Sequence, residues 1–167
     1  MSLQDYAQRK YDYLALQNVK LKGDSLLGLE LFNSQTSGKI CTGIQKLAQR
    51  WLLEFLTERG TMPGFPDRGC NFMRIARQGG LRTRLNVETI FSSSDMLIRR
   101  NLLAEEYPGM PADERFGSAM LLQAAVLPGF DVNQKSGTSI IYLNMRVKIT
   151  SAAGEEYTVI FPVETLP

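Results

Sequence analysis

The chain has 167 residues and a mass of 18.7 kDa, and it is 44% hydrophobic and 22% charged, which is the composition of one ordinary globular domain. Histidine is absent, so Ser-His-Asp and Cys-His nucleophile pairs and zinc sites built on histidine are excluded. The net charge of +2 is too small to indicate a nucleic-acid partner by itself.

Two short strands are predicted in the first 39 residues, which we treat as an N-terminal extension. Apolar runs occupy residues 11–16 and 26–32, and residues 20–24 between them carry lysine, glycine and aspartate, which are typical of a turn. A leucine-rich run of this length fits a buried helix equally well. The polar residues that follow predict a loop before the main domain, residues 40–167.

The clearest helix is predicted over residues 44–56. Apolar side chains recur there at steps of three and four residues and form one stripe, which contains the only tryptophan, Trp51. We interpret Trp51 as an anchor of the core. Thr42 is the expected N-cap, with Gln45 three residues later, and Gly60 is the expected stop.

A segment rich in proline and glycine, residues 61–80, predicts an ordered loop that holds a short helical turn over 71–78. A second long helix is predicted over residues 87–107. Three consecutive serines at 92–94 lower the helix propensity and mark a candidate break, with the last serine or the aspartate after it as the cap of a new start.

After residue 111 the hydrophobic period changes to two, which indicates strands. Strands are predicted over 115–127, 141–150 and 156–163, and residues 151–154 join the last two in a hairpin with one buried face. The residues of the first strand expected to share its buried side are Met120, Leu122, Ala124 and Val126. Helices followed by an antiparallel meander predict an α+β fold, with two main helices packed on a small C-terminal sheet.

Carboxylates are the only credible catalytic material in this chain. The acidic pairs at 105–106, 113–114 and 155–156 are sequence neighbours, whose side chains diverge on a helix and alternate faces on a strand. Glu54 and Glu58 share one side of the first helix, and we interpret that side as solvated. No glycine pattern of a nucleotide-binding loop is present. We therefore predict no enzymatic activity, no cofactor and no metal site.

Charge is distributed unevenly along the chain. Five arginines and no acid lie between Arg68 and Arg84, whereas residues 105–114 carry four acids and no base. Such opposite segments can pair internally or contact neighbouring proteins. Only Phe72 lies among the arginines, so a protein contact is favoured over nucleic acid, and no membrane-spanning segment is expected. The two cysteines, Cys41 and Cys70, are too few for a disulfide framework and favour a reducing compartment.

Three features in chain order match a known pattern. The first helix leads into Thr-Glu-Arg-Gly-Thr at 57–61 and Pro-Asp-Arg-Gly at 66–69, Asp-Glu-Arg-Phe at 113–116 precedes the first long strand, and a hairpin ends the chain. The sequence resembles the baseplate wedge and sheath-initiator family of contractile-tailed bacteriophages, which is related to a baseplate component of type VI secretion. The family carries Glu-Pro-Arg where this chain has Asp113-Glu114-Arg115, which lacks the proline. The resemblance covers about residues 40–163.

The resemblance implies a non-enzymatic structural subunit that initiates the tail sheath by accepting extended arms. It assigns a charged contact to Asp113, Glu114, Arg115 and Phe116. It assigns the hairpin that presents or accepts the arm to Tyr142, Arg146, Tyr157, Val159 and Phe161. It assigns the surface that faces other wedge proteins to Arg68, Arg74 and Arg77.

The partners that the resemblance implies are the tail sheath protein and other baseplate wedge proteins, with the tail tube as a further candidate, and six copies per baseplate. The expected location is the virion tail baseplate, and the host cytoplasm during assembly. A lysozyme-like muramidase of the tail, another phage tail or neck structural protein, and a nucleic-acid binder are the alternatives.

Overall fold

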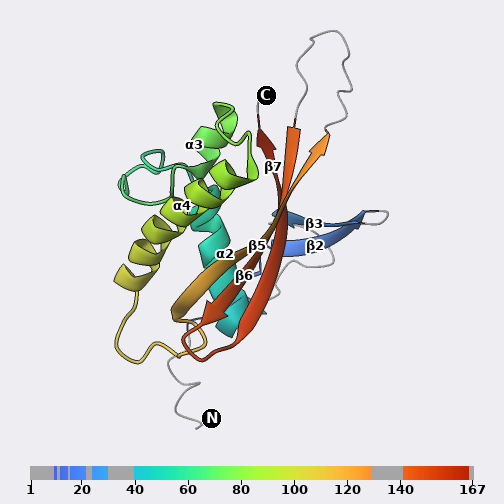
Figure 1. The fold of residues 1–167 in the computed structure, drawn as a ribbon. Helices are drawn as coiled ribbons and strands as arrows, with labels where there is room; N and C mark the ends of the chain where they lie inside the picture. Colours follow the sequence, from blue (N-terminus) through green and yellow to red (C-terminus); the bar gives the residue numbers. More distant parts are fainter. Residues whose placement is uncertain are drawn as a thin grey trace.

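The computed structural model of the protein describes residues 10, 12–14, 16–21, 24–29, 40–128 and 141–165. Three helices pack on one face of a three-stranded antiparallel sheet, which confirms the α+β prediction (Figure 1). The helices are α2 (Gly43–Leu56), α3 (Phe72–Arg77) and α4 (Arg84–Ala104). The sheet has the order β5 (Phe116–Pro128), β6 (Ile141–Ser151) and β7 (Glu156–Thr165).

The N-terminal extension contributes two small antiparallel pairs instead of the one that the sequence suggests. β2 (Leu16–Leu21) pairs with β3 (Asp24–Leu29), and residues 20, 21 and 24 of the predicted turn belong to these strands. β1 (Asp12–Tyr13) separates from this hairpin and pairs with β4 (Ile40–Cys41), just before α2. The first predicted strand therefore belongs to two different ladders, and the loop predicted over residues 33–38 lies outside the described residues.

Helix α2 forms over the predicted residues, with Trp51 and Phe55 buried on its apolar side, but the capping interaction and the stop signal expected at its ends are not used. Thr42 occupies the N-cap position without a side-chain capping bond. The helix ends at Leu56, four residues before Gly60, because the main chain of Thr57 turns to pair with Cys70: the carbonyl of Thr57 accepts from the N–H of Cys70 at 3.0 Å.

Helix α4 begins at Arg84, where the hydroxyl of Thr83 accepts from the N–H of Asn86 at 3.2 Å, and it continues to Ala104 without a break. The predicted break at residues 92–94 is wrong, because the serine hydroxyls donate back to the helix itself. Ser92 donates to the carbonyl of residue 88 and Ser93 to that of residue 90, each at 2.9 Å. Serine bound in this way is compatible with a continuous helix.

The first half of β5 turns the opposite side toward the core from the one predicted, whereas Ala124 faces the core as predicted and the side chain of Val126 lies outside the described residues. Leu122 is 43% exposed and Met120 is also exposed, whereas Ala119, Leu121 and Ala124 pack against the core. A register shift between residues 121 and 123 in the ladder with β6 separates the two halves. A bulge adds one residue to the strand, so the alternation changes phase there.

The core lies between α2 and the sheet. Side chains of β6 and β7 alternate between the core and the opposite face, as predicted. The core side is formed by Leu143, Met145, Val147 and Ile149 of β6 and by their neighbours Val159, Phe161 and Val163 of β7. Phe55 is at the centre: its ring centroid is 5.0 Å from that of Trp51, 4.6 Å from that of Phe72 and 5.5 Å from that of Phe161. Aromatic contacts at these distances stabilise the packing of α2 and α3 on β7.

Adjacent leucines test which side of β5 faces the core before the register shift. Leu122→Ala should change the free energy of unfolding by less than about 0.5 kcal/mol, because the side chain is largely in water. Leu121→Ala should lower it by about 1–3 kcal/mol, because that side chain packs against the core. Urea unfolding followed by Trp51 fluorescence measures both, and equal losses for the two variants would contradict the placement of Leu121 on the core side.

Candidate functional site

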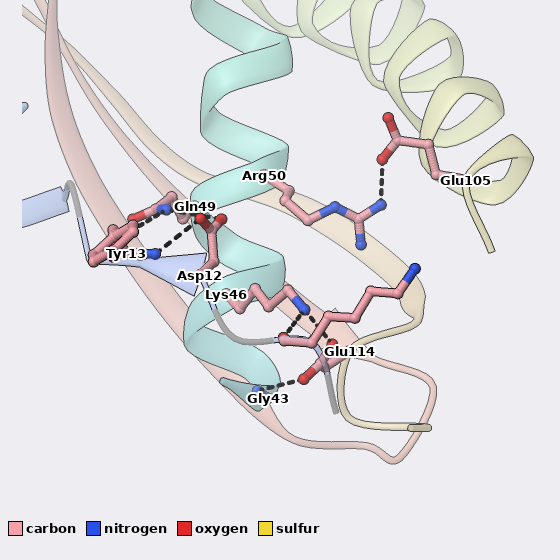
Figure 2. A network of polar contacts seen from close by, with 9 residues as sticks. Asp12, Tyr13, Gly43, Lys46, Gln49, Arg50, Glu105 and Glu114 are labelled. Atoms are coloured by element: carbon pink, nitrogen blue, oxygen red, sulfur yellow. Dashed lines mark hydrogen bonds and ion pairs between the residues drawn. The ribbon is translucent and has the colours of Figure 1, made fainter. Parts of the chain in front are cut away.

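Helix α2 carries a polar stripe, Lys46, Gln49 and Arg50, beside its apolar side (Figure 2). These residues are three and four positions apart and therefore lie on one side of the helix. Lys46 and Gln49 are buried, and buried polar groups need partners within the protein. This stripe is not among the sites predicted from the sequence. The sequence pattern that could have indicated it is the recurrence of polar residues with the same helical period as the adjoining apolar ones.

The carboxylate of Glu114 is fully buried and joins three parts of the chain. Its Oε2 lies 2.7 Å from Nζ of Lys46, and its Oε1 accepts from the N–H of Gly43, the first residue of α2, at 3.3 Å. Nζ of Lys46 also donates to the main-chain carbonyl of Lys10. The ion pair thus fixes the start of α2, the N-terminal segment and the turn before β5 against one another.

The N-terminal segment is held on α2 mainly through its main chain. Nε2 of Gln49 donates to the carbonyl of Tyr13 at 2.8 Å and to Oδ2 of Asp12 at 3.3 Å. The side chain of Tyr13 itself is 73% exposed. Lys46 and Gln49 thus each donate to a main-chain carbonyl of the segment, and the side chain of Asp12 supplies one further acceptor.

The charged contact predicted at residues 113–116 is largely internal. Asp113, Glu114 and Phe116 are buried, so their side chains present no surface to a partner, and the prediction of a partner contact is corrected for these three. The cause is the ion pair with Lys46, which draws Glu114 into the protein. Arg115 is half-buried, and its Nε is buried without a hydrogen-bond partner in the described part of the chain.

Arg68 lies between two acids of its own chain. It pairs with the buried carboxylate of Glu54 and with Glu105, which also pairs with Arg50. Burial lowers the pKa of the Arg50 guanidinium from its usual value. The basic and acidic segments of the sequence therefore meet within the protein, and the interpretation of the Glu54 side of α2 as solvated is wrong.

The other two arginines predicted to face wedge proteins lie on α3. Arg77 is exposed and lies 3.1 Å from a carboxylate oxygen of Glu58. Arg74 is also exposed, and it forms no ion pair with any residue that the structure describes. Of the predicted basic surface, α3 is thus the part that is available to another protein.

The hairpin residues divide between the two faces of the sheet. Val159 and Phe161 are buried in the core and Tyr157 packs against it, whereas Arg146 is exposed on the opposite face. Tyr142 lies in β6 opposite Leu127 of β5, and its side chain lies outside the described residues. Val159 and Phe161 therefore hold β7 on the core and present no side chain to an arm, which corrects their assignment to the arm contact.

Two strands form the edges of this sheet. Within the described residues neither β5 nor β7 is paired on its outer side. The ladder of β5 with β6 has two register shifts, one near each of residues 117 and 122. The ladder of β7 with β6 has none, and β3 lies near β7 without forming a ladder with it. The outer edge of β7 is accordingly the more regular one.

A small pocket of about 240 Å³ lies where the N-terminal segment meets α2. Its lining residues are Lys10, Asp12, Lys46, Arg50, Glu105, Tyr107 and Met110. Nζ of Lys10 lies 4.3 Å from the centre of the Tyr107 ring, and Lys46 and Arg50 are already ion-paired. These contacts hold the N-terminal segment in place, and the arrangement of the pocket residues indicates no particular chemical reaction.

Both cysteines are buried and unpaired. Burial raises the pKa of the Cys41 thiol to about 11, so this thiol is protonated and a poor nucleophile near neutral pH. Among the described residues, no group of three or more cysteine, aspartate or glutamate side chains is arranged to hold a metal ion.

Comparison with family models, with curated proteins and with solved structures gave no match for this chain. None of the described helices is both long and apolar enough to cross a membrane. The structure itself offers three features that another protein could contact: the unpaired edge of β7, the exposed arginines, and the loop between α2 and α3.

Removing one partner of the buried ion pair should be far more damaging than removing both. Glu114→Leu leaves the ammonium of Lys46 buried without its carboxylate and should lower the free energy of unfolding by about 3–5 kcal/mol. The double variant Lys46→Met, Glu114→Leu buries no charge and should recover much of that loss. Urea unfolding of Glu114→Leu, of Lys46→Met and of the double variant measures the coupling free energy between the two side chains. A loss in the double variant equal to the sum of the two single losses would contradict the prediction.

The pH dependence of stability should report Asp95, whose Oδ1 accepts from Nε1 of Trp51 at 3.0 Å. Burial raises the pKa of Asp95 in the folded protein, so this group costs stability as the pH rises from its unfolded pKa through its folded pKa. Asp95→Asn keeps an acceptor for Trp51 and cannot ionise. Its melting temperature should exceed that of the parent at about pH 7, and the difference should disappear near about pH 3. Thermal melts at both pH values measure this, and a difference that grows at low pH would contradict it.

Proposed function

We propose that the protein is a non-enzymatic structural subunit of a contractile-tail baseplate wedge, which initiates the sheath by accepting an extended arm on β7. The observation that carries the proposal is the unpaired, regular outer edge of β7. Exposed edges of this kind are normally covered or interrupted unless they pair with another chain. Addition of a strand gives affinity through main-chain hydrogen bonds.

The position of Pro162 favours an edge that bonds outward along the first half of β7. Proline is tolerated in a sheet where its nitrogen faces away from the neighbouring strand. Pro162 lies opposite Asn144 of β6. Since main-chain groups alternate in direction along a strand, Thr158 and Ile160 share the orientation of Pro162 and direct their N–H and carbonyl groups outward.

The side chains along this edge suit a specific partner better than uncontrolled pairing. Glu156 begins β7 and lies 2.8 Å from Nζ of Lys148, and Pro162 limits how far an added strand can continue. Charges and proline at an edge discourage unspecific association. The assigned charged contact is narrowed to Arg115, since the other three residues of that motif are buried.

The engagement of the carboxylates weighs against a muramidase. Such an enzyme needs two carboxylates that face one cleft, one of which acts as an acid. Glu54 is buried under Arg68 and Asn101, and both oxygens of Glu105 are bound by arginines. These acids are used to hold the protein together.

Thr158→Pro tests the edge directly. It removes an outward N–H and places a ring on the edge without removing a bond to β6, so sheath polymerisation seeded by the protein should be slower by about tenfold or more. Thr158→Ala, which keeps the N–H, is the matched control and should seed like the parent. Electron microscopy and turbidity with purified sheath protein measure the rate. Normal seeding by a folded Thr158→Pro variant would reject β7 as the accepting strand.

A further inference from the structure

The loop between α2 and α3, residues 57–70, is closed at its base by its own main chain. The N–H of Cys70 donates to the carbonyl of Thr57, and the N–H of Arg59 donates to the carbonyl of Cys70, each at 3.0 Å. Gly69 has a φ of +82°, and a Cβ at this position would lie 2.3 Å from the carbonyl oxygen of Thr57. Only glycine permits this closure. The segment is thus an Ω loop with a fixed neck.

Two consecutive turns shape the tip of the Ω loop. The N–H of Phe65 donates to the carbonyl of Met62, and the N–H of Arg68 donates to the carbonyl of Phe65, each at 3.1 Å. Proline follows the first residue of each turn, and Gly64 supplies a φ of +78° in the first. Proline at the second position presets the turn and reduces the freedom of the unbound loop.

Side chains from α2 and α4 hold the Ω loop from inside. The buried carboxylate of Glu54 accepts from the N–H of Gly69 at 2.9 Å and from Nδ2 of Asn101 at 3.0 Å. Asn101 also donates to the carbonyl of Asp67 at 3.1 Å, and Arg59 pairs with the Asp67 carboxylate at 2.7 Å. The chain therefore uses a buried acid, a buried amide and an arginine to fix a loop that contributes little to the core.

The fixed tip presents two large apolar side chains to solvent. Phe65 is 61% and Met62 is 41% exposed. Figure 1 shows the Ω loop projecting to one side of α3 and α4. The acids near it, Glu54, Glu58 and Asp67, are each paired with an arginine.

Exposed positive charge is carried by the two helices next to the Ω loop, α3 and α4. Arg100 of α4 is close enough to Asp67 to lower the pKa of that carboxyl, after the larger effect of the hydrogen bond from Arg59. Arg74, Arg99 and Arg100 are exposed and form no ion pair with the described residues. A partner surface that matches this region carries an apolar pocket with acidic residues at its rim.

We propose that Phe65 and Met62 are an anchor that inserts into an apolar, acid-rimmed pocket of a neighbouring protein. Under the proposed function, on which this identification of the partner rests, that neighbour is another wedge protein. An aromatic side chain on a loop that is already ordered binds without the entropy cost of ordering the loop. The anchor and the edge of β7 are on different elements and use different chemistry, so each can be tested without the other.

The test compares the double variant Met62→Ser, Phe65→Ser with the control Leu85→Ser, which changes a leucine that is 70% exposed at the start of α4. Neither should shift the melting temperature appreciably, because these side chains do not contact the core. The probes are the purified wedge proteins of the same particle, each measured alone by calorimetry at low and high salt. One of them should bind the parent and the control equally and bind the double variant about tenfold or more weakly. Its binding to the parent should also weaken with salt.

Each outcome of this test decides the proposal. Equal binding of the double variant overturns the anchor, and a concentration-dependent dimer of the parent that the double variant lacks would identify a second copy as the partner instead. Loss of wedge binding with unchanged seeding of free sheath separates the anchor from the β7 edge. Where no wedge protein binds the parent, a photo-crosslinking residue at position 65 is compared with one at position 85 in the native cell. Adducts no stronger at position 65 overturn the anchor, whereas a partner crosslinked there supports it once the purified partner shows the same dependence on Phe65 and Met62.

Discussion

Glu114 and Lys46 are removed from water together, and three segments of the chain meet at their contact. The carboxylate satisfies the first N–H of α2, while the ammonium holds the carbonyl of Lys10. A buried pair of this kind adds little net stability, but it specifies geometry, because neither charge can be left alone in the interior. Since α2 also carries Trp51 and Phe55, the pair sets how the aromatic core meets the sheet.

A second group of charges performs the same task at the other end of α2. Glu54 binds Arg68 and the main chain of the Ω loop, and Arg68 reaches Glu105 after α4. Several charged side chains that the sequence suggested as partner contacts therefore form ion pairs within the protein. What remains for association is of two kinds: main-chain groups along β7, and a few exposed side chains on the Ω loop, α3 and α4.

Local periodicity predicted the elements whose character is decided within a few residues. The alternation from Leu143 to Ile149 and the stripe of α2 are examples, because the spacing of the apolar residues alone predicts which side is buried. The side of β5 that faces the core could not be predicted, since the bulge at residue 122 is defined only by the partner strand. The burial of Lys46 depends on an acid 68 positions away, and no local pattern contains that information.

The same limit applies to the candidate sites. An unpaired edge follows from any small sheet, so the sequence could indicate it, but the regularity of β7 and the irregularity of β5 appear only in the ladders. The exposed Phe65 lay within a segment that composition described simply as a loop. Its importance comes from Gly69 and Asn101, which fix the Ω loop from elsewhere in the chain.

The way in which α2 grips the N-terminal segment has an evolutionary consequence. Lys46 and Gln49 hold the carbonyls of Lys10 and Tyr13, and every amino acid supplies an identical carbonyl. A change at either position therefore keeps the carbonyl bond, although loss of the Lys10 side chain removes its contact with Tyr107. Sequence drift there would be a poor guide to whether the attachment has been lost, and retention of the lysine and glutamine on the helix would be the better one.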